Sequence, residues 1–205
     1  MATIEFDHVV IAVTDLTDAA RTFAARHGLV SIEGGRHPGW GTANRIVPLG
    51  DSYLELIGVV DGSEAATNAV GRWVAGGATE SGRLLGWAVR TADLDDVAQR
   101  LGVSAVPGSR ATPTGETIRW RTVGVDQAIE DPSLPFFIER PPDAPFPGTV
   151  SRPVATLSEL EVQGRPAKIS AWLGGDHSLP VRIADGSPGI ARIVLTSADR
   201  EIVIG

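Results

Sequence analysis

The sequence predicts an α+β fold made of tandem β-α-β-β-β modules, and an internal repeat is the main observation behind this prediction. Residues 7–16 (DHVVIAVTDL) return in altered form as residues 85–94 (LGWAVRTADL), so that Asp93 follows Asp15 by 78 residues. In both copies a run with apolar residues at helical spacing follows the Asp-Leu pair, and strand-like runs complete the copy. A third stretch repeats this order of elements more weakly, so we interpret it as a degenerate third module.

The first module shows a signal for each of its elements. Its first strand is rich in Val and Ile, Asp15 or Thr17 is suited to cap the helix that follows, and Gly28 to end that helix. A glycine-rich loop with unusual side chains (GGRHPGWGT) comes before a hairpin that turns at Gly50-Asp51-Ser52. The expected elements are a strand at 4–13, a helix from Leu16, a strand at 30–33, the loop at 34–42 and hairpin strands at 43–49 and 53–59.

The second and third modules are separated by a proline-rich stretch. Proline is excluded from helix interiors and central strands, so the segment that begins RPPDAPFP at Arg140 is expected to be a connection without regular structure. A short helix is expected at 68–75, before the second module, whose helix is expected at 94–101 and hairpin strands at 117–123 and 135–139. The predicted divisions are a first module at 1–60, a connecting segment at 61–83, a second module at 84–140, the connection at 141–156 and a third module at 157–205.

Composition excludes several classes of protein. The chain has 205 residues, no Cys and a formal net charge of −7, which argues against disulfides, thiolate metal sites, nucleic acids and anionic membrane surfaces. The N-terminus lacks the basic and apolar regions of a signal peptide, and no apolar run approaches the ~18 residues of a membrane span. We therefore expect a soluble, cytoplasmic protein, and the Ala/Gly/Arg-rich usage favours a bacterial one.

A tandem β-α-β-β-β repeat with a histidine early in its first strand resembles the vicinal oxygen chelate superfamily, which includes glyoxalases, extradiol dioxygenases, epimerases and antibiotic-resistance proteins. Residues 7–10 (DHVV), 35–44 (GRHPGWGTAN) and 53–57 (YLELI) look like its glyoxalase-like branch. The resemblance extends over essentially the whole chain. It implies that two modules form a strongly curved, mostly antiparallel half-barrel sheet, with helices on the convex side and a site in the concavity. It does not fix the function, because many reactions occur on one fold.

The resemblance also implies positions for metal ligands, on the first and last strands of each module. In the first module these positions fall on His8 and Glu55. In the second module the match of Leu54-Glu55 to Ile138-Glu139 gives Glu139, and the remaining position is Gly86, which has no side chain to ligate. The implied metal site therefore consists of His8, Glu55 and Glu139, with an open space at Gly86.

The chemistry of these three side chains leaves two alternatives. One imidazole and two carboxylates suit a divalent Zn, Mn, Fe or Ni ion, and Glu55 or Glu139 would then act as a ligand or as a general base. A carboxylate among apolar residues is costly to bury unless it is paired or bound to metal. The alternative is that His8 hydrogen-bonds one glutamate in a polar cavity that holds no metal.

The glycine-rich loop and three tryptophans supply the candidate substrate-binding residues. Arg36 can pair with a carboxylate or phosphate, and His37 and Asn44 can hydrogen-bond a ligand that the loop covers. The alternative is that these side chains satisfy buried backbone carbonyls. Trp40, Trp87 and Trp120 can line the cavity, although aromatic side chains more often belong to the core.

Three functions are compatible with the sequence. The first is metal-assisted isomerase, lyase or dioxygenase chemistry on a small oxygenated molecule. The second is a metal-free protein that sequesters a small molecule, and the third is a partner-binding scaffold without a ligand cavity. We favour a small-molecule site, with the enzyme ahead of the binding protein. The third module lacks ligand-type residues at the matching positions, so we expect it to pack on the others, cover an edge strand or mediate a homodimer.

Overall fold

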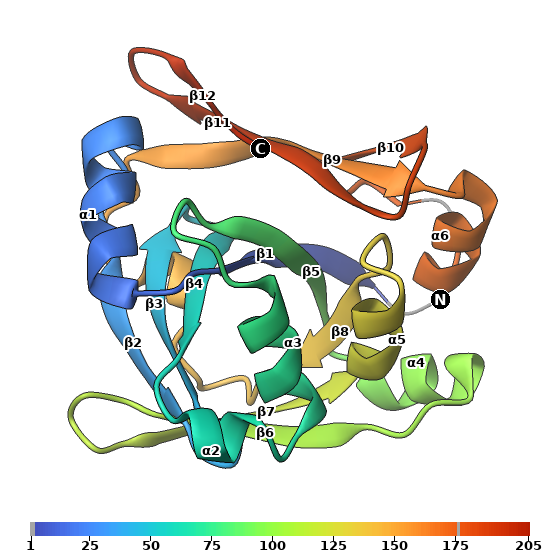
Figure 1. Cartoon of the computed structure of the whole chain (residues 1–205). Coiled ribbons are helices and arrows are strands. Elements are labelled where there is room, and N and C mark those ends of the chain that lie inside the picture. Colours follow the sequence, from blue (N-terminus) through green and yellow to red (C-terminus); the bar gives the residue numbers. More distant parts are fainter. Residues whose placement is uncertain (1–2, 176) are drawn as a thin grey trace.

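The structure, a computed structural model, describes residues 3–175 and 177–205 (Figure 1). The predicted succession of β-α-β-β-β modules is confirmed. The first module contains β1 (Ile4–Ala12), α1 (Leu16–His27), β2 (Ile32–His37), β3 (Thr42–Pro48) and β4 (Tyr53–Val59), followed by α2 (Gly62–Ala65) and α3 (Ala69–Gly77). The second contains β5 (Arg83–Thr91), α4 (Leu94–Leu101), β6 (Val106–Ala111), β7 (Thr117–Val123), α5 (Val125–Glu130) and β8 (Phe136–Glu139). A 3-10 turn at Pro147–Thr149 leads to β9 (Ala155–Gly164), α6 (Pro166–Leu173), β10 (Val181–Asp185), β11 (Gly189–Ser197) and β12 (Glu201–Ile204).

The first two modules share one curved sheet, as predicted, and its curvature continues until the sheet closes into a barrel. The strand order around the barrel is β1-β4-β3-β2-β6-β7-β8-β5. Within each module the first strand runs parallel to the last, in the pairs β1–β4 and β5–β8. The modules join through two antiparallel pairs, β1–β5 and β2–β6. These two junctions place the inner faces of both modules around one interior.

The repeat in the sequence corresponds to equivalent helix starts. α1 begins one residue after Asp15, whose carboxylate accepts hydrogen bonds from Thr17 N and Asp18 N, each at 2.8 Å. α4 begins one residue after Asp93, which makes no side-chain capping bond. Gly28 and Gly102 end the two helices in the left-handed conformation that glycine adopts without strain.

The prediction of a glycine-rich loop at 34–42 is wrong for residues 34–37, which belong to β2, and only the turn at 38–41 is irregular. The reason is that β2 pairs with β6 at the seam where the two modules meet. A Cβ on Gly35 would lie 2.1 Å from the carbonyl oxygen of Ala111 on β6, so glycine allows the two strands to approach closely. The partner strand β6 includes Pro107 and Gly108. These residues interrupt the alternation of apolar and polar side chains, so the sequence pattern does not indicate a strand there. In addition, β7 and β8 are not a simple hairpin, because α5 connects them.

Two hydrophobic clusters lie on opposite faces of the barrel sheet. The alternating residues Val9 and Ile11 of β1 belong to the outer cluster, whereas Val10 and Ala12 belong to the inner one. The sheet of the third module, β10-β9-β11-β12, packs on the outer cluster and shares it with α1 and α4. The expectation that this module packs on the other two is therefore confirmed. No helix in the part of the chain described is both long and apolar enough to cross a membrane.

Candidate functional site

The barrel encloses a cavity of about 70 Å³ between its strands and the helices α3 and α5. This is space for several water molecules or a small organic molecule, since one water requires roughly 10–15 Å³ measured in this way. Its described lining residues all lie between His8 and Arg140, so the third module contributes none of them. The polar lining side chains are His8, His37, Asn44, Tyr53, Glu55, Arg110, Thr122 and Arg140.

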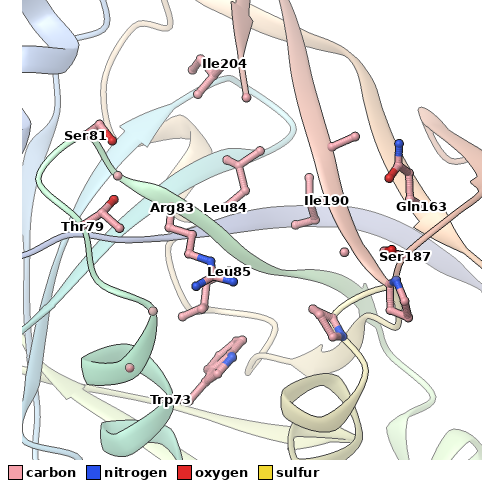
Figure 2. A pocket seen from close by; sticks show the side chains of 18 of the residues that line it. Trp73, Thr79, Ser81, Arg83, Leu84, Leu85, Gln163, Ser187, Ile190 and Ile204 are labelled. Atoms are coloured by element: carbon pink, nitrogen blue, oxygen red, sulfur yellow. The ribbon is translucent and has the colours of Figure 1, made fainter.

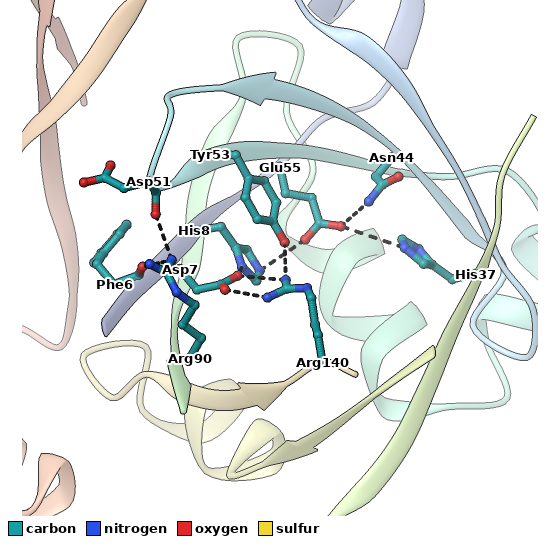
Figure 3. A network of polar contacts seen from close by, with 10 residues as sticks. All are labelled: Phe6, Asp7, His8, His37, Asn44, Asp51, Tyr53, Glu55, Arg90 and Arg140. Carbon is teal, nitrogen blue, oxygen red and sulfur yellow. Dashed lines mark hydrogen bonds and ion pairs between the residues drawn. The ribbon is translucent and has the colours of Figure 1, made fainter. Parts of the chain in front are cut away.

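A β-bulge at the start of the cavity brings two consecutive polar side chains together. The pairing of β1 with β5 shifts between Phe6 and His8, which leaves Asp7 as the extra residue. His8 Nδ1 lies 2.5 Å from an oxygen of Asp7, and both side chains are buried (Figure 3). Arg140, which follows β8, donates to both oxygens of Asp7 at 2.5 and 2.9 Å and to the Tyr53 hydroxyl at 2.9 Å.

This bonding fixes the charge of Asp7 and the tautomer of His8. Burial alone would raise the pKa of Asp7, but Arg140 and His8 hold it well below its ordinary value, so the carboxylate is ionised. An ionised carboxylate only accepts hydrogen bonds, so His8 donates from Nδ1 and turns Nε2 toward the cavity. Tyr53 stacks on the His8 ring at 4.6 Å, and burial raises the pKa of Tyr53, which keeps it neutral.

Glu55 lies at the centre of the polar group. One of its oxygens is 3.5 Å from His8 Nε2, and the other accepts from Asn44 Nδ2 at 2.5 Å and lies 3.8 Å from His37 Nε2. Asn44 reaches Glu55 across the pair of strands β3 and β4, beside Gly34, where a Cβ would lie only 2.0 Å from the amide oxygen of Asn44. Three side chains of the first module thus converge on one carboxylate.

His37 and Arg110 complete the wall around Glu55. Burial lowers the pKa of His37 to about 4, against the attraction of Glu55 and with the help of Arg110, so His37 is neutral at pH 7. Arg110 is a cation in this wall, and burial lowers its pKa. Its Nε is buried without a hydrogen-bond partner among the described residues. The nearby amide oxygen of Asn44 is also buried without a partner among the described residues. Because buried polar groups are nearly always paired, this donor and this acceptor are available to a ligand or to water.

A family model described as glyoxalase-like domain matches residues 6–175, which include both modules of the barrel. The chain belongs to the glyoxalase-like domain family. The resemblance to the vicinal oxygen chelate superfamily is thereby confirmed.

Several solved structures are similar to this glyoxalase-like protein, and the first of them agrees with its fold. A hypothetical protein from Staphylococcus aureus has a TM-score of 0.72 at 18% identity, with 97% of this chain and 93% of that chain covered. Methylmalonyl-CoA epimerase from Mycobacterium tuberculosis has a TM-score of 0.46 at 21% identity, with 67% and 88% covered. A hypothetical protein from Bacillus halodurans C-125 has a TM-score of 0.48 at 16% identity, with 70% and 99% covered. None of the curated proteins matches the chain.

Glu139, predicted to join His8 and Glu55, lies on the outer face of the barrel. It pairs with Arg121, which also pairs with Asp95 of α4. The strand register gives the reason. Val10 pairs with Glu55 in the first module, and Ala88, its counterpart in the repeat, pairs with Phe136 in the second. Phe136 therefore occupies the place of Glu55, and Glu139, an odd number of residues later, points to the opposite face.

The predicted open space at Gly86 is also absent. A Cβ on Gly86 would lie 2.8 Å from the ring of Trp73, so this indole already fills the region where a fourth ligand was considered. Within the ranges 3–175 and 177–205, no group of three or more His, Cys, Asp or Glu side chains is arranged to hold a metal ion. The implied three-ligand set does not fit this site, because Phe136 and Trp73 stand where the second module would supply donors.

The predicted substrate-binding residues divide into two groups. His37 and Asn44 line the cavity, as do Trp40 and Trp120, whose rings meet at 6.1 Å. Arg36 was wrongly placed there, because it alternates with His37 on β2 and is exposed. Trp87 is a fully buried core residue of the outer cluster, since it has the parity of Val89, and it donates to the Ser133 carbonyl at 3.2 Å.

Sequence reasoning missed Trp73, Arg110 and Arg140 in the cavity wall, and Asp7, which does not line the cavity but holds His8 and Arg140. Asp7 was missed because alternation alone places it on the outer face, and no sequence signal marked the bulge. Arg110 and Arg140 belong to or follow strands whose registers were unknown. The Asp7-His8 dipeptide was the available signal, since a carboxylate next to an imidazole is a common way to orient it.

A groove of about 680 Å³ adjoins the cavity on the outside of the barrel end. Trp40, Trp120 and Arg140 line both the groove and the cavity, so these three side chains form the partition between them. The rest of the groove includes Pro38, Pro107, Pro141 and Pro142 beside the charged residues Arg119, Arg121 and Glu139. The partition thus separates the cavity from an open groove.

Proposed function

We propose that the barrel cavity binds a small molecule with a carbonyl or carboxylate group and moves a proton at the carbon beside it, in an isomerase or lyase reaction. The unpaired Nε of Arg110 is the observation that carries this proposal, because it leaves a cationic donor available in the same cavity wall as Glu55. A ligand oxygen would satisfy that donor and place the neighbouring carbon next to Glu55 and His8.

The residues divide the chemistry as follows. Glu55 takes the proton from carbon, the electron pair moves onto the carbonyl oxygen, and Arg110 stabilises the resulting enolate. His8 Nε2, 3.5 Å from Glu55, shares the proton and returns it to carbon. Asp7 is a positioning residue that holds the imidazole through Nδ1, and its negative charge stabilises the imidazolium while the proton is held.

A binding protein of the sequestering type is the second candidate, and the aromatic wall favours it. Trp40, Trp73, Trp120, Tyr53 and Phe136 all line the cavity. Such a wall holds a ligand without reacting with it. The two candidates differ in one measurable property, because only the enzyme exchanges carbon-bound hydrogen with water.

Hydrogen exchange distinguishes the enzyme from the binding protein. The protein is incubated in D2O with pyruvate and 2-oxobutanoate, and proton NMR follows the loss of the C–H signal beside the carbonyl. We expect exchange above the buffer rate and a loss of about a hundredfold or more in Glu55→Gln. Arg110→Met should both weaken binding and slow exchange, because it removes the cation that stabilises the enolate.

Two controls make the outcome decisive. Glu139→Gln, on the outer face, should leave exchange unchanged, and treatment with a chelator should not abolish it. Ligand line broadening without exchange would identify the binding protein. If neither 2-oxo acid showed line broadening or hydrogen exchange, the proposal would be overturned.

A further inference from the structure

A second concave region lies between the barrel and the third module (Figure 2). Among the described residues it shares with the barrel cavity only Trp73, whose indole lies between them. Its volume is about 900 Å³. The walls come from the end of α1, from α3 and β5, and from β11 and β12 of the third module. The size falls within the range of roughly 300–1,000 Å³ typical of sites for small organic molecules. The proposed proton-transfer function assigns no role to this cleft.

The charge of the cleft is opposite to that of the protein. Its charged or titratable lining side chains are Arg26, His27, Arg72 and Arg83, and no Asp or Glu side chain lines it among the described residues. The chain as a whole has a formal net charge of −7. A group of cations without anions creates a local positive potential that attracts anionic ligands.

None of the three arginines forms an ion pair within the part of the chain that the structure describes. Arg72 donates only one hydrogen bond from its guanidinium there, to the Ala66 carbonyl at 3.0 Å. His27 shows the effect of this positive potential, because burial lowers its pKa and the charges of Arg26 and Arg200 lower it further.

The rest of the lining combines an apolar stretch around Trp73, Leu85 and Ile190 with hydroxyl and amide side chains. Figure 2 shows Arg83, Leu85 and Trp73 along one wall, facing Ser187 and Ile190 across the cleft. Thr79 and Ser81 lie on the same side as Arg83. An apolar wall that includes an indole and is bordered by guanidinium groups matches a ligand with an apolar or aromatic body and an anionic end.

We propose that this cleft binds a small organic anion, with a phosphate or carboxylate group between Arg26 and Arg83 and an apolar body against Trp73. Arg72 adds a third positive charge on the α3 side. A bare inorganic ion binds more weakly, because it leaves the apolar wall in contact with water.

Calorimetric titration with phenyl phosphate, phenylacetate and inorganic phosphate tests the site and distinguishes the two anionic groups. We expect phenyl phosphate or phenylacetate to bind at least tenfold more tightly than inorganic phosphate. The double variant R26A/R83A should weaken that binding at least tenfold. Both arginines are exposed, so the fold should persist, and circular dichroism verifies this. The single variants Arg26→Gln and Arg83→Gln give an intermediate loss.

The matched control is R21A/R182A, which removes two exposed arginines outside the cleft. It should bind the aromatic anions as the wild type does. Amide NMR shifts should fall on cleft residues such as Gly76, Gly77 and Gly82. No binding of either aromatic anion, an equal loss in the control, or shifts confined to the barrel cavity would overturn the proposal. Glu55→Gln should leave this binding unchanged, which separates the cleft from the barrel site.

Discussion

The inner faces of the two barrel modules differ sharply although their strands correspond. The first module presents His8 and Glu55 on β1 and β4. At the matching positions the second presents Gly86, covered by Trp73, and Phe136, whose ring meets His8 edge-on at 5.5 Å. At these matched positions the first module thus supplies the acid–base groups and the second supplies apolar surroundings, although Arg110 and Arg140 of the second module add the two cations of the site. Two repeated modules can therefore keep equivalent backbones while only one of them carries the acid–base side chains at the matching positions.

The largest expected effect comes from the buried ion pair at the base of the first module. Asp7→Ala leaves Arg140 without its carboxylate in a buried place, and we expect a loss of about 3–5 kcal/mol in the free energy of unfolding. Urea denaturation measures this loss. The outer pair of the second module is the matched comparison, because Arg121 is 42% exposed. Arg121→Ala should cost only about 0–1 kcal/mol, and equal losses would show that burial does not distinguish the two pairs.

The next effect depends on pH. The pKa of His37 is about 4 in the folded protein and 6.5 ordinarily, so between these values the unfolded chain binds more protons than the folded one. The contribution of His37 therefore makes stability fall as pH drops from 6.5 to 4, by about 3 kcal/mol in all. Denaturation of the wild type and of His37→Gln over this range measures the difference. Parallel curves would contradict the prediction.

A smaller effect is expected where Trp73 covers the second module. Gly86→Ala introduces a Cβ 2.8 Å from the indole ring, and we expect a loss of about 1–3 kcal/mol in the free energy of unfolding from overpacking. The cost of the substitution should shrink in a Trp73→Leu background, which removes the obstructing ring. Thermal unfolding of the four proteins of this cycle measures the coupling, and strict additivity would refute the contact.

The smallest effect is expected at Glu139, which defines the outer face of the second module. Glu139→Gln should change the free energy of unfolding by no more than about 1 kcal/mol, because it affects a partly exposed ion pair on the outer face. Elemental analysis and calorimetry with added Zn²⁺ should give the same metal content and affinity for the variant as for the wild type. Loss of metal on this substitution would show that Glu139 is a metal ligand together with His8 and Glu55, contrary to its position on the outer face.

Much of the fold could be predicted from local patterns. The offset between Asp15 and Asp93 predicts the two equivalent helix starts. The alternation of side chains along a strand predicts that His8 and Val10 face one way and Val9 and Ile11 the other, and it predicts that Tyr53, Glu55 and Ile57 share a face. In the structure Val9 and Ile11 belong to the outer cluster, whereas His8, Val10, Tyr53, Glu55 and Ile57 line the cavity. These features depend only on the period of a strand or helix, which the sequence displays directly.

The rest depended on register, which one sequence does not display. A shift of one residue moves a side chain from the cavity to the outer face, and this separates Phe136 and Ile138 in the cavity from Glu139 outside it. The bulge at Asp7, the seam that needs Gly35 and the arrival of Arg110 and Arg140 beside Glu55 were likewise decided by pairing between distant strands. The sequence by itself determined which elements form and which faces are apolar, because those are local properties. Only the tertiary structure decided which polar side chains meet, because that depends on how the strands close into a barrel.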